Sequence, residues 1–171
     1  MAERRNLFVP GKTEYVKAKR SRAAGECILC DIARGADTVV NLQVARDNGF
    51  VVSLNLYPYN PGHVMIFPAR HVEDPRELSP DELGHLARLQ NLALDVLAAE
   101  YQAGGFNVGF NLGEAAGASL PHLHLHVVPR YKRELGVLDV LSGTKIIIED
   151  PHETQRRLRA AFEHALQKSR G

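Results

Sequence analysis

The sequence predicts an α+β domain in which an antiparallel sheet of five or more strands packs with one long helix and a C-terminal helix. Three observations carry this prediction. Short apolar runs bounded by turn residues follow one another along most of the chain, as in consecutive antiparallel strands. One long amphipathic pattern is inserted among them, and a second one closes the chain. The 171 residues are enough to bury a single core.

Composition narrows the class of protein. The 21 basic residues nearly balance the 20 acidic ones, so no overall field favours nucleic acid or a membrane surface as a partner. No apolar stretch approaches the ~20 residues of a membrane span, and the basic start of the chain has no apolar core like that of a signal peptide. We therefore expect a cytoplasmic protein with a basic N-terminal arm over residues 1–24 and one domain over residues 25–171.

The first predicted elements are strands. Residues 39–46 and 50–56 are rich in apolar and β-branched side chains, and Asp47-Asn48-Gly49 between them favours a hairpin turn. A second turn over 57–62, which contains two prolines and a glycine, leads into a strand over 63–68. The first half of the domain is therefore expected to form consecutive antiparallel strands.

The long helix is predicted to begin at a capping box. Ser79 is followed by proline at the first helical position and by Glu82 three residues later. Leucine and valine then recur at helical spacing as far as Leu97, and the pattern ends before Gly104. After it we expect, in order, a strand over 106–112, a loop rich in glycine and alanine over 113–120, a strand over 122–129, short strands over 138–141 and 145–148, and a helix from about 150 to 167.

Three histidines alternate with apolar residues near the middle of the chain. Because a strand sends alternate side chains to opposite faces, His122, His124 and His126 would share one face. Neighbouring imidazoles would stand ~6.7 Å apart along the strand, which suits one small anion held among them. The alternatives are a histidine-rich strand with satisfied hydrogen bonds, or an adventitious metal patch.

The loop from Asn111 to Ser119 joins two predicted strands and leads directly into the histidine run. Its glycines allow backbone N–H groups to approach an anion closely, and such loops commonly hold phosphate. By itself such a loop can equally be a flexible turn. Beside the histidines it favours a phosphate-containing ligand.

These segments together resemble the signature of the histidine-triad (HIT) superfamily. Residues 109–119, followed by His-Leu-His-Leu-His-Val-Val-Pro-Arg, are similar to its second half, and residues 54–58, 61–66 and 68–71 are similar to its first half. The resemblance covers residues 27–130. It implies a HIT-like fold that binds nucleotides and pairs as a homodimer through the long helix and a sheet strand.

The resemblance also implies catalytic roles. His124 would be the nucleophile that attacks an α-phosphorus and forms a covalent nucleotidyl-imidazole, with its other ring nitrogen held by a backbone carbonyl. His126 would contact the α-phosphate or the bridging oxygen, and Ser119 would hydrogen-bond the leaving oxygen. Asn111 and the amide of Gly113 would bracket phosphate oxygens. From the residues alone, Ser119 could instead cap the loop and Asn111 could end a strand.

On the nucleoside side, Asn55 resembles the family's contact to the ribose hydroxyls, while Leu54 and Leu56 would wall the base. Asn55 could instead be a turn residue. His63 is interpreted as a buried scaffold histidine and is left outside the predicted site.

The cysteines have a use in zinc-bearing members of the family. By resemblance, Cys27, Cys30, His71 and His122 would form a closed tetrahedral set, so the zinc would be structural. No organic cofactor is expected. A reactive dithiol and two unrelated thiols are the other interpretations of a Cys-x-x-Cys pair.

The predicted function is cleavage of a diadenosine polyphosphate, with the tetraphosphate favoured, by transfer of a nucleotidyl group to phosphate or to water. This matches the bacterial phosphorylase-like and hydrolase-like members. One alternative is an adenosine phosphoramidase, which needs the same core. Another, from a different class, is a zinc-containing module that binds nucleotide or nucleic acid without turnover, although the charge balance does not favour nucleic acid.

Overall fold

The computed structural model describes residues 27–132 and 149–170. The predicted arm over residues 1–24 and the short strands over 138–141 and 145–148 lie outside this part of the chain. None of the helices within the described ranges combines the length and apolar character that a membrane span requires.

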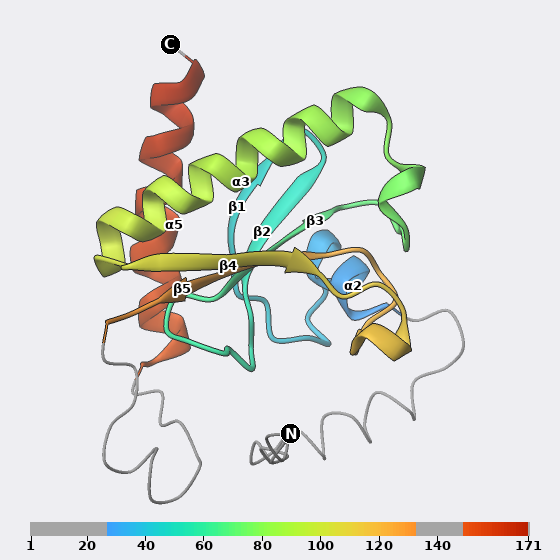
Figure 1. Ribbon diagram of the computed structural model, residues 1–171, viewed down its shortest axis with the longest axis horizontal. Coiled ribbons are helices and arrows are strands. Elements are labelled where there is room, and N and C mark those ends of the chain that lie inside the picture. Colours follow the sequence, from blue (N-terminus) through green and yellow to red (C-terminus); the bar gives the residue numbers. More distant parts are fainter. Residues whose placement is uncertain (1–26, 133–148, 171) are drawn as a thin grey trace, which may run out of the picture.

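Five antiparallel strands form one sheet in the order β1-β2-β3-β5-β4 (Figure 1). The strands are β1 (Gln43–Asp47), β2 (Phe50–Leu54), β3 (Val64–Pro68), β4 (Gly105–Phe110) and β5 (Leu125–Arg130). Each neighbouring pair is antiparallel. The predicted α+β class with a five-stranded antiparallel sheet is therefore confirmed.

Helices cover both faces of this sheet. In the described part of the chain, the α-helices are α2 (Ile28–Arg34), α3 (Pro80–Tyr101) and α5 (Pro151–Arg170), with single 3-10 turns η1 (Pro75–Glu77) and η2 (Glu114–Ala116). Figure 1 shows α3 running along the sheet and crossing α5. Both pack in one apolar cluster, whereas α2 packs in a second cluster on the other face.

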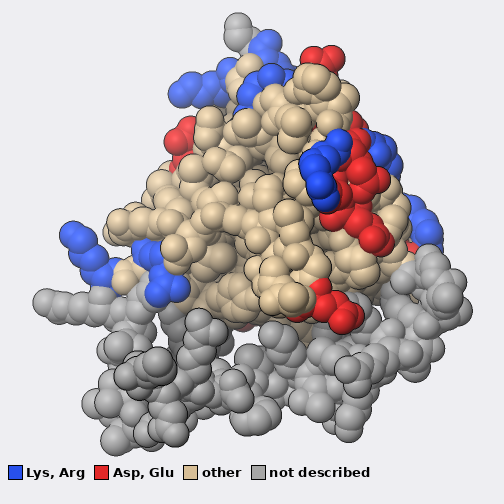
Figure 2. Space-filling view, turned by 45° about the vertical axis from the view of Figure 1, so that its right-hand side comes forward, with Lys and Arg blue, Asp and Glu red and all other residues tan. Residues whose placement is uncertain are grey.

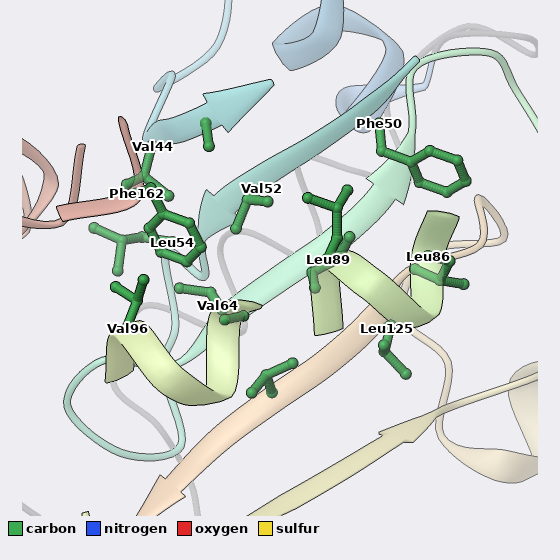
Figure 3. Close-up of a cluster of buried hydrophobic side chains, with 14 of the residues drawn as sticks. Val44, Phe50, Val52, Leu54, Val64, Leu86, Leu89, Val96, Leu125 and Phe162 are labelled. Atoms are coloured by element: carbon green, nitrogen blue, oxygen red, sulfur yellow. The ribbon is translucent and has the colours of Figure 1, made fainter. Parts of the chain in front are cut away.

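The larger core lies between the sheet and the pair α3 and α5, as Figure 3 shows in close-up. Val52, Leu54 and Val64 face this side, and α5 contributes Phe162, which has no exposed surface. The alternate residues of β2 and β3 face α2 instead, including Met65. Since β2 and β3 are buried on both faces, their residues are apolar on both faces, apart from Ser53, rather than alternating.

The β1–β2 hairpin has the turn that its sequence predicts. Asp47 pairs with Phe50, so the loop has two residues, and both Asn48 (φ 41°) and Gly49 (φ 81°) are left-handed. Asparagine and glycine tolerate this conformation better than other residues do. The turn fixes the register of β1 on β2, and thereby which residues of β2 face each core.

The capping box of α3 is also confirmed. Ser79 Oγ accepts from the Glu82 N–H at 3.2 Å, and the Glu82 carboxylate accepts from the Ser79 N–H at 2.8 Å. The helix ends at Tyr101, and Gln102 follows in a left-handed conformation. This end places the chain at the start of β4.

Several predicted boundaries are wrong. The histidine strand was expected from residue 122, but β5 begins at Leu125, where pairing to Ile66 of β3 begins. β1 begins at Gln43 rather than at residue 39, because residues 39–42 connect α2 to the sheet. α2 was not predicted, because this helix of seven residues is held by packing more than by propensity.

Candidate functional site

Two histidines meet at the start of β5 on the face that α2 covers. The ring centroids of His124 and His126 lie 4.7 Å apart, and the ring planes are inclined by 74°. His126 pairs in register with Met65, which belongs to the α2-side cluster, whereas Leu123, Leu125 and Val127 pack in the opposite core. The predicted separation of histidines from leucines across this segment is therefore confirmed.

A backbone carbonyl fixes the ring of His124. Its Nδ1 lies 2.7 Å from the carbonyl oxygen of His122. Because a carbonyl can only accept, Nδ1 carries the proton, and Nε2 of the neutral ring keeps a lone pair. A neutral imidazole held in this way directs Nε2, the nitrogen that carries the lone pair, to act as the nucleophile.

A chain of hydrogen bonds sets the proton positions of His126. The backbone N–H of Tyr59 donates to Nδ1 of His63 at 3.1 Å, so neutral His63 carries its proton on Nε2. That Nε2 lies 3.0 Å from Nδ1 of His126 and donates to it. His126 must then carry its own proton on Nε2, as an N–H donor on the side of the ring away from His63.

Asn111 lies on that side. Its side-chain amide nitrogen is placed 3.4 Å from Nε2 of His126. Since Nε2 is the protonated nitrogen, the matching partner is the amide oxygen, which a half-turn of the side chain brings to the same place. Asn111 thus ends the chain of polar groups that begins at Tyr59.

Burial keeps these rings neutral. Desolvation, followed by the neighbouring His126 and His124, lowers the pKa of His63 to about 3. Desolvation and His124 lower the pKa of His126 to about 4. A buried imidazole without an anionic partner resists protonation because the charged form loses its hydration. Near neutral pH, His126 is therefore a neutral hydrogen-bond donor.

The two rings open into a cleft between the sheet and α2. The lining contains these predicted site residues: Leu54, Asn55, Leu56, Asn111, Ser119, His124 and His126. Gly113 is not among the lining residues. Its carbonyl accepts from the N–H groups of Ala116 and Ala118, so it anchors the loop, and Gly117 of the same loop faces the cleft instead.

One wall of this cleft was not predicted from the sequence. Ile28, Leu29 and Ile32 of α2 line it, together with Val40 and Leu42 of the following segment. The signal was present as apolar residues one and four positions apart after Cys27. A helix this short is difficult to recognise from periodicity.

Asn55 both shapes the turn and lines the cleft. Its side-chain oxygen accepts from the Tyr57 N–H at 3.0 Å. The side-chain nitrogen of the same amide can still donate to a ligand. Asn55 is thus a turn residue whose side chain also lines the cleft, and its contact with the ribose hydroxyls stays a prediction.

His122 does not join the other two histidines, and the expectation of one anion shared by all three is wrong. Its Nδ1 lies 3.2 Å from Sγ of Cys27 and 3.5 Å from Sγ of Cys30, and its Nε2 lies 2.9 Å from the Pro68 carbonyl oxygen. Both ring nitrogens are occupied away from the cleft. The reason is that β5 has not yet begun at His122, so strand alternation does not govern its direction.

The four predicted metal ligands instead form a cluster of their own. One ligand atom from each of Cys27, Cys30, His71 and His122 lies within 4.8 Å of all the others. An ideal tetrahedral zinc site, with Zn–S of about 2.3 Å and Zn–N of about 2.0–2.1 Å, separates sulfur from nitrogen by about 3.5 Å. The observed sulfur–nitrogen distances of 3.2 to 3.5 Å fit that value.

The outer contacts of this cluster also fit a metal. Both histidines offer Nδ1 to the thiols, and each directs Nε2 to an oxygen: His71 to Glu73 at 3.2 Å and His122 to Pro68 at 2.9 Å. Such oxygen partners orient the imidazoles of metal sites. Burial and the neighbouring Cys27 raise the pKa of Cys30 to about 11, so its thiolate needs a bound cation to form at neutral pH.

Sequence comparison matches more than half of this chain to one domain family and also finds individual relatives. The HIT domain family model matches residues 38–133. The AP-4-A phosphorylase of Mycobacterium tuberculosis is 42% identical over 118 residues, which are 68% of this chain and 60% of that protein. The asymmetrical bis(5'-nucleosyl)-tetraphosphatase of Schizosaccharomyces pombe is 34% identical over 88 residues, 52% of this chain and 48% of that protein. The matches thus span only about half to three fifths of these relatives.

A solved structure adds a likeness in three dimensions. A zinc-bound histidine triad family protein from Mycobacterium smegmatis superposes with a TM-score of 0.66 and 27% identity, covering 86% of this chain and 99% of that one. A third sequence relative, a HIT-like protein of Methanocaldococcus jannaschii, is 31% identical over 106 residues, 62% of this chain and 80% of that protein.

Proposed function

Because this chain belongs to the HIT domain family, we propose that it is an enzyme that transfers a nucleotidyl group from a dinucleoside polyphosphate through His124. The observation that carries the proposal is the orientation of this ring. Its Nδ1 is held by the His122 carbonyl at 2.7 Å, which leaves Nε2 as the nucleophilic nitrogen in a cleft that His126 also lines.

In the first step, the Nε2 lone pair of His124 attacks the α-phosphorus. A phosphorus–nitrogen bond forms, and the bond from that phosphorus to the bridging oxygen breaks, so the rest of the polyphosphate leaves with the electron pair. The Nε2–H of His126 donates to the phosphate oxygens as negative charge develops. Ser119 donates to the leaving oxygen, and Asn111 with the glycine loop over 113–117 brackets the phosphate.

In the second step, an acceptor oxygen attacks the same phosphorus and releases His124. With diadenosine tetraphosphate, the first step releases ATP. Inorganic phosphate as acceptor then yields ADP, whereas water yields AMP. The names of two relatives, a phosphorylase and a tetraphosphatase, support this substrate class and are compatible with either phosphate or water as the acceptor.

The apolar end of the cleft suits a nucleobase. Leu54 and Leu56 from the sheet side and Ile32 from α2 line it, and Asn55 stands between the two leucines in the sequence. We assign the base to these side chains and the ribose hydroxyls to the Asn55 amide. The phosphate chain then runs toward His124 and His126.

Zinc is proposed as a structural ion in the cluster of Cys27, Cys30, His71 and His122. Four protein ligands leave no position open for substrate, so the ion would supply cross-linking and no chemistry. The support is the fit of the ligand distances and the zinc in the Mycobacterium smegmatis structure. Bound there, it would hold α2, one wall of the cleft, against the segment that carries His124.

A homodimer through β4 is also proposed. β4 lies at one end of the sheet order, contains no charged residue, and leaves Val108 39% exposed. Figure 2 shows a broad area without Lys, Arg, Asp or Glu on the face that it displays. An uncharged edge strand can pair with another strand. Light scattering should give twice the mass of the chain, and Val108→Lys should shift it toward the monomer.

Product analysis tests the proposed reaction. The protein is incubated with diadenosine tetraphosphate with and without phosphate, and the nucleotides are separated by chromatography. ATP with ADP only in the presence of phosphate identifies a phosphorylase, and ATP with AMP identifies a hydrolase. A parallel incubation with adenosine 5′-phosphoramidate covers the related activity. Tight nucleotide binding without turnover of any of these would leave a binding module and refute the enzyme.

A further inference from the structure

Besides the nucleotide cleft, the protein has a polar groove. It lies on the opposite side of the segment over residues 40–43, which forms part of the cleft wall. It forms where the end of α2, the start of β1 and the first half of α5 meet, and it has a volume of about 560 Å³. Three arginines from these three elements line it, namely Arg34, Arg46 and Arg159. We propose that this groove is a second anion site that binds a phosphate group.

The guanidinium groups are held in place by the backbone. Arg46 donates through Nη2 to the Ala33 carbonyl at the end of α2. Arg159 donates through Nη2 to the Gln43 carbonyl at 2.8 Å. A guanidinium has five N–H donors in a planar fork, so one bond to a carbonyl orients the group and leaves donors for a ligand. Phosphate matches that fork in geometry and charge.

The charge of the groove is not neutralised by the described part of the protein. Arg34 pairs with Asp31 of the same helix. Within residues 27–132 and 149–170, neither Arg46 nor Arg159 forms an ion pair with a carboxylate. The remaining lining side chains are amides or apolar groups and include Asn41, Gln43 and Gln155. Among the described residues, two positive charges of the groove therefore have no carboxylate partner.

Amide contacts make the floor of the groove rigid. The Gln155 side chain donates to the carbonyls of both Asn41 and Gln43, at 3.1 and 2.9 Å. Asn41 in turn donates to the Ile32 carbonyl at 3.2 Å. These bonds tie α5, β1 and α2 together. The groove is therefore preorganised for a ligand.

The groove is separate from the nucleotide cleft. Val40 and Leu42 line the cleft, whereas Asn41 and Gln43 line the groove, as expected for alternate residues of an extended segment. Ile32 is the residue that the two linings share. An anion in the groove would therefore bind behind the base wall and beyond the reach of His124, so this site does not depend on the proposed reaction.

The ligand is a phosphate oxyanion, either free or carried by a nucleotide. A backbone amide titration observed by NMR separates the sources, with inorganic phosphate in one arm and AMP in the other, at constant ionic strength. Saturable shifts of the Gly35 and Gln43 amides in both arms at equal affinity assign the site to the phosphate group itself. Affinity for AMP at least fivefold tighter assigns it to a nucleotide. No saturable shift of these amides in either arm overturns the proposal.

Charge-removing variants locate the site. Arg46→Gln with Arg159→Gln keeps N–H donors for the two carbonyls but removes both charges, and should weaken phosphate binding at these amides at least tenfold. The matched control is Arg156→Gln, an exposed arginine of α5 that does not line the groove; it should change the affinity by less than twofold. The wild-type affinity in the double variant would contradict the assignment. The amide spectrum of each variant also reports whether it is folded.

Discussion

Nε2 of His63, whose side chain has no exposed surface, lies 3.0 Å from Nδ1 of His126, which lines the cleft. Because the Tyr59 N–H already occupies the other nitrogen of His63, this contact has one direction. His63 donates and His126 accepts, so the proton of His126 is kept on the nitrogen away from His63. His63, a residue outside the predicted site, thus determines which tautomer of His126 faces a bound ligand.

Replacing His63 should impair catalysis more than nucleotide binding. His63→Ala leaves Nδ1 of His126 without its donor, so the ring can take the other tautomer or turn, and kcat should fall by about 10²-fold with little change in KM. His63→Gln can still donate to His126 and should recover part of the loss. Steady-state kinetics of both variants checks this. His164→Ala, an exposed histidine of α5, is the control; an unchanged kcat in His63→Ala would refute the positioning role.

Stability should fall in mild acid. The pKa of His63 is lowered from 6.5 to about 3, and that of His126 to about 4, so between these values and 6.5 the unfolded chain binds protons that the folded chain does not. The free energy of unfolding should therefore drop as the pH falls below about 6.5, by about 1.4 kcal/mol per pH unit for each such histidine. Urea unfolding between pH 7.5 and 5 measures the slope.

The control for this slope is His63→Gln, which removes one of the two titrating rings. Its slope should be shallower by about one proton equivalent over the same range. An unchanged slope would mean that His63 is not held neutral by burial.

Zinc should bind with one ion per chain and raise the melting temperature. Cys30→Ser and His71→Ala should each abolish stoichiometric zinc in elemental analysis, because each removes one of four ligands. Treatment of the wild type with a strong chelator should lower Tm on the order of 10 °C. His152→Ala, an exposed histidine of α5, should keep its zinc. Full zinc content in Cys30→Ser would contradict the assigned ligands.

Much of the fold follows from local sequence patterns. The hairpin at Asn48-Gly49 and the capping box at Ser79 are short-range features, and both are confirmed. The start of β5 was placed three residues too early, because the alternation of His122, His124 and His126 looks the same whether or not a neighbouring strand pairs with it. Pairing is a long-range property that one segment cannot show.

The site was predicted less completely than the fold. The predicted cleft residues and the metal ligands came from resemblance, and the structure brings each group together except for Gly113, which does not line the cleft. His63 was correctly expected to be buried, but its hydrogen bond to His126 joins residues 63 positions apart and has no local signal. The α2 wall was missed because Ile28, Leu29 and Ile32 acquire meaning only when the helix packs on the sheet.

The core between α5 and the sheet should be essential for stability. Phe162 has no exposed surface and packs with Val44, Leu54 and Val96 in the larger cluster (Figure 3). Phe162→Ala should lower the free energy of unfolding by about 3–5 kcal/mol, because it removes buried apolar surface and leaves a cavity. Urea denaturation measures this. Arg156→Ala on the exposed side of the same helix should stay within about 0.5 kcal/mol of the wild type.

The most direct test of the central claim is to look for a nucleotide covalently attached to His124. The protein is mixed with diadenosine tetraphosphate without added phosphate, quenched within a turnover under conditions that preserve phosphorus–nitrogen bonds, and digested for peptide mass spectrometry. We expect a nucleotidyl adduct on His124, with none in His124→Ala, which should lose turnover at least about 10³-fold while still binding nucleotide. An adduct on another residue, or near-normal turnover in His124→Ala, would contradict the account.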